Sequence, residues 1–148
     1  MAVVGVERGG ICLVDLNPVR GSEQRGIRPC LVISNDVVNE YAPTVCVIPF
    51  TSNLDGRRFP INVVLTRDDT ALKADSLLLC GQIRTVAKER LLRKLSSVKA
   101  ERMPDIEKAL MLYLGLAPWL GISQLRSGRA VLDPTRGSAG DTGAFEGP

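Results

Sequence analysis

The chain has 148 residues, 45% of them hydrophobic, and a formal net charge of +3 at pH 7. These values fit one globular domain with a sizeable core and leave too little chain for two ordinary domains. No apolar run is long enough to span a bilayer, and the first residues lack the basic and apolar segments of a signal peptide. We therefore expect a cytoplasmic protein with no membrane partner, whose mild positive charge suits an anionic partner.

The sequence contains no histidine and four cysteines. The lack of histidine excludes Ser-His-Asp and Cys-His catalysis, paired-histidine RNA cleavage and every histidine-based metal site. Cys12, Cys30, Cys46 and Cys80 lie in or beside apolar runs without the close spacing of zinc ligands. We expect buried, reduced thiols and no metal, although an even count also allows disulfides in an oxidising compartment.

Short runs rich in Val, Ile and Leu, separated by turn residues, predict a mainly β domain. The predicted strands are Ile11–Leu16, Cys30–Ser34, Val45–Thr51, Phe59–Leu65, Ser76–Leu79 and Gln82–Val86. Closely spaced strands of this kind form a small barrel or a strongly bent sheet. Val32-Ile33 and Val45–Ile48 are apolar without alternation, so these central strands should be covered on both faces.

The pattern changes towards the C-terminus. Leu91–Val98 reads as a strand or an irregular connection, and a helix begins between Ala100 and Pro104 and runs to about Leu114. Its apolar stripe consists of Met103, Ile106, Leu110, Tyr113 and Leu114. A shorter helical turn is predicted at Asp36–Tyr41, capped by Asn35 or Asp36. The domain should occupy residues 1–120, followed at 121–148 by a Gly-rich segment without periodicity that we predict to be disordered.

A polar segment, Arg20–Pro29, separates the first two predicted strands. It contains arginines, a serine and a carboxylate where the sequence predicts an exposed loop, and such loops often carry function. Arginine suits phosphate recognition, because its planar donors can grip two oxygens at once. The segment therefore indicates a phosphate-binding site, and its alternative interpretation is a solvated hairpin loop.

A colinear set of motifs extends across the chain from Val6 to Leu116. It comprises Arg8-Gly9, Val14–Pro18, Gly21–Gln24, Arg28-Pro29, Leu31–Asp36, Pro43-Thr44, Ile48–Ser52, Gln82–Thr85 and Leu114–Leu116. In order and spacing, this set resembles the MazF/PemK toxin family. The sequence departs from the family pattern at Gly10, at Ile11-Cys12 and at Cys80-Gly81.

The resemblance implies a fold and a function. The fold would be α+β, mainly β with a C-terminal helix: a small SH3-like barrel of the CcdB/MazF/PemK type, working as a homodimer. The function would be that of a toxin endoribonuclease that cuts single-stranded RNA, including mRNA, at specific sequences without a metal or other cofactor. Attack by the RNA's own 2′-hydroxyl would leave a 2′,3′-cyclic phosphate and a 5′-hydroxyl. A cognate MazE-like antitoxin would neutralise the toxin.

Family matching also assigns the site residues. Arg28 and Thr51 take the catalytic positions. Arg28 would stabilise charge on phosphorus, with protonation of the leaving oxygen as a second candidate role, and Thr51 would hold the scissile phosphate. Glu23 is the carboxylate available to accept the 2′-hydroxyl proton, and its alternative role is a salt-bridge partner of Arg25 or Arg28. The candidate RNA contacts are Ser22, Gln24, Arg25, Ser52, Asn53, Gln82 and Arg84, the last two with an alternative role in the barrel and dimer. Arg57 and Arg58 are interpreted as solvated loop residues, with the steering of RNA phosphates as their alternative role.

Two other functions stay open at the level of sequence. The related CcdB toxins use the same barrel as a protein-binding poison of DNA gyrase without nuclease chemistry. An inactive module that binds RNA or the antitoxin is the other alternative. Aromatic rings for base stacking are scarce: Phe50 and Phe59 are predicted to lie in the core, Tyr113 on the helix stripe, and Tyr41 is the one obvious exposed candidate.

Overall fold

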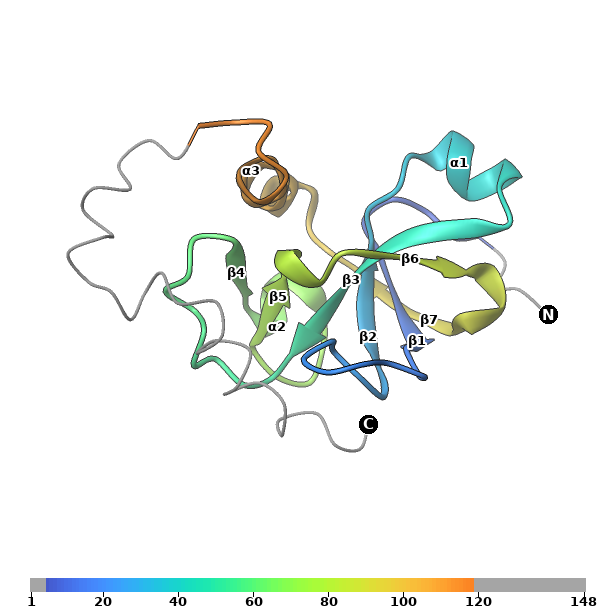
Figure 1. Cartoon of the computed structure of the whole chain (residues 1–148), viewed down its shortest axis with the longest axis horizontal. Helices are drawn as coiled ribbons and strands as arrows, with labels where there is room; N and C mark the ends of the chain where they lie inside the picture. Colours follow the sequence, from blue (N-terminus) through green and yellow to red (C-terminus); the bar gives the residue numbers. More distant parts are fainter. Residues whose placement is uncertain (1–4, 119–148) are drawn as a thin grey trace.

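The structure, a computed structural model, describes residues 5–118 as one bent antiparallel sheet with helices around it (Figure 1). The strands are β1 Gly10–Asp15, β2 Ile27–Val32, β3 Thr44–Thr51, β4 Asn62–Leu65, β5 Ser76–Leu79, β6 Arg84–Ala87 and β7 Leu91–Ser97. The helices are α1 Asp36–Tyr41, α2 Arg67–Thr70 and α3 Met103–Tyr113, with single 3₁₀ turns at η1 Cys80–Gln82, η2 Lys88–Arg90 and η3 Ala100–Arg102. The predicted tail at 121–148 lies outside the described residues.

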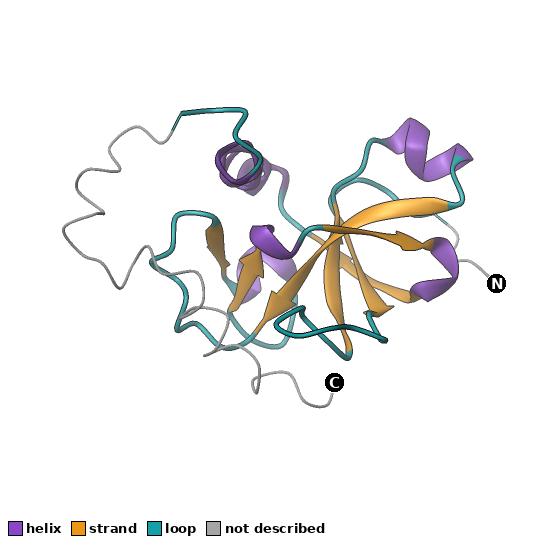
Figure 2. Ribbon diagram, in the orientation of Figure 1, coloured by secondary structure: helices purple, strands orange, loops and turns teal. Residues whose placement is uncertain are grey.

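The sheet has the strand order β4-β5-β3-β2-β1-β7, with β6 paired to β3. The long strand β3 joins the two halves, because its first part pairs with β6 and its end pairs with β5 (Figure 2). Within residues 5–118 no ladder joins the end strands β4 and β7. The expected mainly β domain with a C-terminal helix is therefore confirmed, as a strongly bent sheet that is not closed into a complete barrel.

Side chains from both faces of the central strands are buried, as the lack of alternation predicts. One core cluster includes Leu31, Ile48 and Phe50 together with Ile106 of α3. The other lies on the opposite face and includes Cys30. Burying both faces of β2 and β3 fixes the strand register, since a slip by one residue would exchange the two sets of side chains.

Helix α3 begins as predicted, with Pro104 in its first turn, and Gly115 follows its end in a left-handed conformation (φ 73°). Its stripe is buried only in part: Ile106 and Leu110 lie in the core, whereas Tyr113 and Leu114 are 44% and 53% exposed. Tyr113 lies on the stripe as predicted and its ring packs beside Gly81, but nearly half of its surface is left exposed. Among residues 5–118 no helix is long and apolar enough to cross a membrane.

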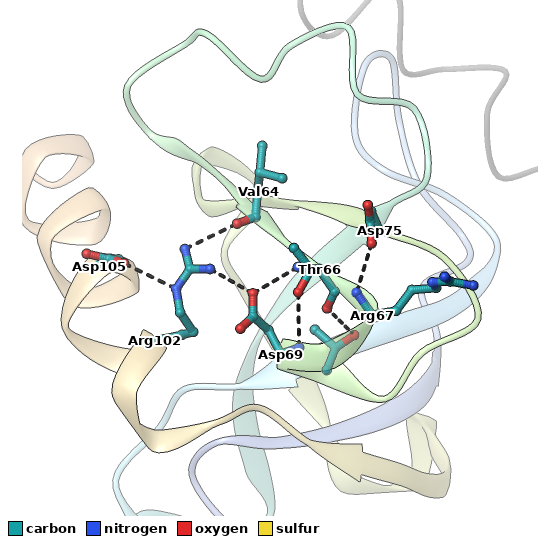
Figure 3. Close-up of polar contacts among 8 residues, drawn as sticks. Val64, Thr66, Arg67, Asp69, Asp75, Arg102 and Asp105 are labelled. Atoms are coloured by element: carbon teal, nitrogen blue, oxygen red, sulfur yellow. Dashed lines mark hydrogen bonds and ion pairs between the residues drawn. The ribbon is translucent and has the colours of Figure 1, made fainter.

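A polar cluster ties the start of α3 to the sheet (Figure 3). Arg102 donates to the Asp69 carboxylate at 2.7 Å, to the Val64 carbonyl at 3.2 Å and to the Asp105 carboxylate at 3.2 Å. Asp69 also belongs to the capping box of α2, whose N-cap is Thr66. A Thr followed three residues later by an acidic side chain is a signal for the start of a helix, and here it begins α2 between β4 and β5.

Two strands begin three residues away from their predicted starts. Strand β2 begins three residues early, at Ile27, because the ladder with β1 continues through the pairs Leu13–Pro29 and Val14–Arg28. Strand β4 begins late, at Asn62, and Phe59 is half-buried in the preceding turn rather than placed in the core. The helical turn of α1 is confirmed, with the Asn35 side chain accepting from the Val37 amide at 2.7 Å.

Candidate functional site

The loop between β1 and β2 is held at its base by main-chain and side-chain contacts. The Leu16 amide donates to the Gly26 carbonyl at 3.0 Å, and the Gly26 amide donates to the Asn17 side chain at 3.1 Å. From η2, Arg90 donates to the carbonyls of Asp15, at 3.1 Å, and Asn17. The loop therefore leaves and re-enters the sheet through a closed stem (Figure 1).

Further along the loop, the side chain of Gln82 from η1 forms two hydrogen bonds with the loop backbone. The Gln24 amide donates to the Gln82 side-chain oxygen at 3.1 Å, and the Gln82 side-chain nitrogen donates to the Ser22 carbonyl at 3.4 Å. Gln24 is only 7% exposed, and Arg25 turns back onto the loop by donating to the Gly21 carbonyl at 2.9 Å. The Ser22–Arg25 segment is thus an ordered part of the site.

Arg28 lies within β2 and is buried, with 2% of its surface exposed. The expectation of an exposed loop arginine is wrong at this position, because Arg28 belongs to the hairpin ladder. Its Nε donates to the Arg25 carbonyl at 2.7 Å, and its Nη1 lies 3.4 Å from the Phe50 carbonyl. The guanidinium is therefore directed at the end of β3 and at the loop backbone.

Thr51 ends β3 beside this guanidinium. The ladder between β2 and β3 ends at the pair Cys30–Pro49, and Arg28 Nη1 lies 3.4 Å from the carbonyl of Phe50, the residue before Thr51. The Thr51 side chain is buried, and its hydroxyl accepts from the Asn53 amide at 3.1 Å. The structure thus brings the two predicted catalytic residues together at one end of the central strands.

The other candidates lie around this pair. Glu23 is exposed, and its carboxylate accepts from the Arg20 amide at 2.5 Å, which caps a turn of the loop. Ser22 and Ser52 are exposed, whereas Asn53 is half-buried and accepts from the Asp55 amide at 2.9 Å. A general-base role for Glu23 stays a prediction.

A small open cavity separates the loop from η1 and β6. It has a volume of about 200 Å³ and is lined by Glu23, Gln24, Gly81, Gln82, Ile83 and Arg84. Arg84, one of the lining residues, donates to the Leu16 carbonyl at 3.1 Å. Glu23, Gln24, Gln82 and Arg84 are thereby gathered into one concave surface.

Comparison with known proteins identifies the family of the chain. A family model described as the PemK-like, MazF-like toxin of type II toxin-antitoxin systems matches residues 7–114. The chain belongs to this family.

Solved structures of toxins share its fold. An endoribonuclease from a mycobacterial species, solved in complex with its cognate antitoxin, is 28% identical with a TM-score of 0.64, and the match covers 78% of this chain and 99% of that one. A second mycobacterial endoribonuclease is 25% identical with a TM-score of 0.63, covering 79% and 97% of the two chains. MazF from Deinococcus radiodurans is 25% identical with a TM-score of 0.65, covering 74% and 96%.

The thiols of this MazF-like chain are structural in character. All four cysteines are free. Cys12, Cys30 and Cys80 are buried, as predicted, whereas Cys46 is only half-buried, so the prediction is wrong at that position. Burial raises the pKa of Cys80 to about 12 and raises that of Cys30, which lies near the Arg28 and Arg84 guanidinium groups. Among the described residues, no cluster of Asp, Glu and Cys side chains is suited to hold a metal ion.

Some features of the site in this family member escaped the sequence analysis. The hydrogen bonds from Arg90 to the carbonyls of Asp15 and Asn17 have no local sequence signal, because they join residues more than 70 positions apart. Tyr41 is exposed, as predicted, at 78%, but Tyr113 is a second exposed aromatic residue. Gln82 lies in a 3₁₀ turn instead of the predicted strand, which lets its side chain reach the loop.

Proposed function

We propose that this chain is a toxin endoribonuclease that cleaves single-stranded RNA at specific sequences without a metal. The RNA's own 2′-hydroxyl gives up its proton and attacks phosphorus, while the bond from phosphorus to the 5′-oxygen breaks. The departing 5′-oxygen takes up a proton, so the products carry a 2′,3′-cyclic phosphate and a 5′-hydroxyl. Membership of the MazF-like family and the resemblance to structures of endoribonucleases support the class of activity.

One observation carries the proposal within this chain. Arg28 and Thr51 come from neighbouring strands and meet at the same end of the sheet, with the Arg28 guanidinium against the Phe50 carbonyl. Arg28 stabilises the negative charge that develops on phosphorus, a kind of contact worth about 3–4 kcal/mol in other enzymes. Thr51 holds the scissile phosphate by a hydrogen bond from its hydroxyl.

The remaining steps fall to the loop and its surroundings. Glu23, exposed at the rim of the cavity, accepts the 2′-hydroxyl proton. Ser22, Arg25, Ser52 and Asn53 bind RNA from the two loops that flank the catalytic pair. Arg84 contributes charge from the cavity lining, where its pairing with the Leu16 carbonyl fixes its direction.

Access to the catalytic pair requires a movement of the loop. Arg28 and Thr51 are 2% and 0% exposed, and the Arg25 carbonyl occupies the single N–H of Arg28 Nε. A phosphate can be gripped on that side of the guanidinium only after this carbonyl has moved away. We infer that the Ser22–Arg25 segment shifts when RNA binds.

The proposed assembly is a cytoplasmic homodimer restrained by a cognate MazE-like antitoxin. Apolar side chains at the end of α3 and just beyond it support a protein contact there, since Met111, Tyr113, Leu114 and Leu116 are between 43% and 71% exposed. The structural relative solved with its cognate antitoxin supports the restraint. A net charge of +3 favours a partner with an acidic segment.

The chemistry of the product ends tests the proposal. Fragments of a long RNA should accept phosphate from ATP and polynucleotide kinase at their 5′ ends without prior phosphatase treatment, because these ends carry free hydroxyls. Fragments with 5′-phosphates would contradict attack by the 2′-hydroxyl. Intact RNA together with inhibition of DNA gyrase supercoiling would replace the proposal by the gyrase-poison function.

A further inference from the structure

Two hydrogen bonds join the Gln82 side chain to the β1–β2 loop, and in both of them the loop partner is a backbone group. The side-chain oxygen accepts from the Gln24 amide at 3.1 Å, and the side-chain nitrogen donates to the Ser22 carbonyl at 3.4 Å. One side chain therefore binds the loop on both sides of Glu23, whatever side chains the loop carries.

The turn that carries Gln82 is itself firmly packed. Cys80 is fully buried, and the Ile83 amide closes the turn on the Cys80 carbonyl at 3.3 Å. Gly81 lies against Ile61 and Tyr113, so that a Cβ at this position would come within 3.1 Å of Ile61 Cδ1 and 3.5 Å of Tyr113 Cε1. The turn that carries Gln82 is thus anchored in the core beside α3, and any movement of the loop must break the two hydrogen bonds.

The segment held by Gln82 leads directly to the buried catalytic arginine. Arg25 follows Gln24, and its carbonyl accepts from Arg28 Nε at 2.7 Å. As long as Gln82 holds Gln24 and Ser22, the Arg25 carbonyl stays bonded to Arg28 Nε. A phosphate then cannot bind the guanidinium on the Nε side.

We propose that Gln82 is a positioning residue that latches the β1–β2 loop in a state closed to RNA; the inference rests on the proposed RNA cleavage. Binding of RNA then includes breaking both hydrogen bonds of the latch. The apparent affinity is reduced by the fraction of molecules in the closed state. Removing the latch should therefore strengthen RNA binding, whereas loss of a direct RNA contact would weaken it.

The experiment compares Gln82→Leu and Gln82→Glu with the wild-type chain. Leucine removes both hydrogen bonds, while glutamate keeps the acceptor for the Gln24 amide and loses the donor to the Ser22 carbonyl. Thr85→Ala, a change at an exposed position on the neighbouring strand β6, is the matched control. Thermal unfolding of each variant checks that the fold is retained.

Amide hydrogen exchange of the full chain without RNA measures the latch itself. The Gln24 amide should exchange roughly five- to a hundredfold faster in Gln82→Leu, the range that two neutral hydrogen bonds allow. It should exchange at an intermediate rate in Gln82→Glu. The Leu16 amide, which bonds the Gly26 carbonyl in the loop stem, should keep its protection in every variant. Unchanged exchange at Gln24 in Gln82→Leu would overturn the proposal.

Fluorescence anisotropy with a random-sequence 2′-O-methyl RNA, which lacks the attacking hydroxyl, measures binding. Gln82→Leu should bind more tightly than wild type by a factor similar to its gain in exchange, and Thr85→Ala should match wild type. Weaker binding by Gln82→Leu would overturn the latch and make Gln82 an RNA contact. If no variant binds RNA but exchange at Gln24 rises as expected, the hydrogen-bond latch stands and the proposed RNA function fails.

Discussion

Replacement of Asp69 tests how the start of α3 is fastened to the sheet. The Asp69 carboxylate accepts from the Thr66 amide at 2.9 Å and from Arg102 at 2.7 Å, with its side chain 13% exposed (Figure 3). Loss of a helix cap costs about 0.5–2 kcal/mol, and loss of a hydrogen bond to a charged group about 1.5–3 kcal/mol. The Arg102 side chain is 27% exposed and can be hydrated when Asp69 is removed. The cost of losing its hydrogen bond should therefore lie at the lower end of the range for charged groups. We expect Asp69→Ala to lower the free energy of unfolding by about 2–3 kcal/mol.

Asparagine at this position separates the two contributions. Its side-chain oxygen can still accept from the Thr66 amide, so Asp69→Asn should lose only the charge paired with Arg102, about 1 kcal/mol. The matched control is Asp68→Asn on the same short helix, where the carboxylate is exposed. This control should change the free energy of unfolding by less than about 0.5 kcal/mol. Urea unfolding at pH 7 measures all of these differences.

The same variants give a pH dependence with a defined sign. The hydrogen bond from the Thr66 amide is the largest cause that lowers the pKa of Asp69, followed by its side-chain bond with Thr66 and by Arg102. A carboxylate with a lowered folded-state pKa contributes stability above its unfolded pKa, near 4, and this is lost as pH falls through the folded value. The gap between wild type and Asp69→Asn should therefore shrink below about pH 4. A gap that stays constant from pH 7 to pH 3 would refute the reasoning.

Three further predictions follow from burial. Ile106→Ala should lower the free energy of unfolding by about 2–5 kcal/mol in denaturant melts, because Ile106 is fully buried where α3 meets the sheet. A loss below about 1 kcal/mol would show that α3 is not anchored there. Thr51→Val should abolish RNA cleavage and cost about 1 kcal/mol of stability, since the Asn53 amide loses its acceptor; cleavage at the wild-type rate would remove Thr51 from the mechanism. In alkylation experiments at pH 8, Cys30 and Cys80 should react only on unfolding, because burial raises the pKa of both thiols; rapid labelling of the folded chain would contradict this.

Local sequence signals predicted most of the secondary structure. Turn residues and apolar runs located the strands, Pro104 and Gly115 marked the limits of α3, and Asn35 marked the start of α1. The start of β2 was missed because it depends on pairing with β1, which carries the strand through Pro29. Pairing partners of this kind are fixed by tertiary structure and leave no signal in the strand itself.

Family spacing predicts which residues form the candidate site but not how they are arranged. It brings Arg28 and Thr51 into one hypothesis, and in the structure Arg28 Nη1 lies 3.4 Å from the carbonyl of Phe50, the residue before Thr51. The burial of Arg28 could not be predicted, since arginine is rarely fully buried and its acceptors, the Arg25 and Phe50 carbonyls, are backbone groups. The hydrogen bonds of Gln82 with the loop could not be predicted for the same reason. Both partners are backbone groups, which every residue of the loop carries, so no side chain in the sequence marks them.

Incubation of a long single-stranded RNA with the purified chain in EDTA tests the central claim most directly. The wild-type chain should produce defined cuts, and Arg28→Ala and Thr51→Ala should abolish them. The control variant Arg57→Ala should cut normally, because Arg57 is an exposed loop residue whose side chain donates to the nearby Leu54 carbonyl at 3.0 Å. The account would be contradicted if the folded wild-type chain left the RNA intact, or if cuts persisted in Arg28→Ala. Cleavage that requires added magnesium would contradict the metal-free mechanism.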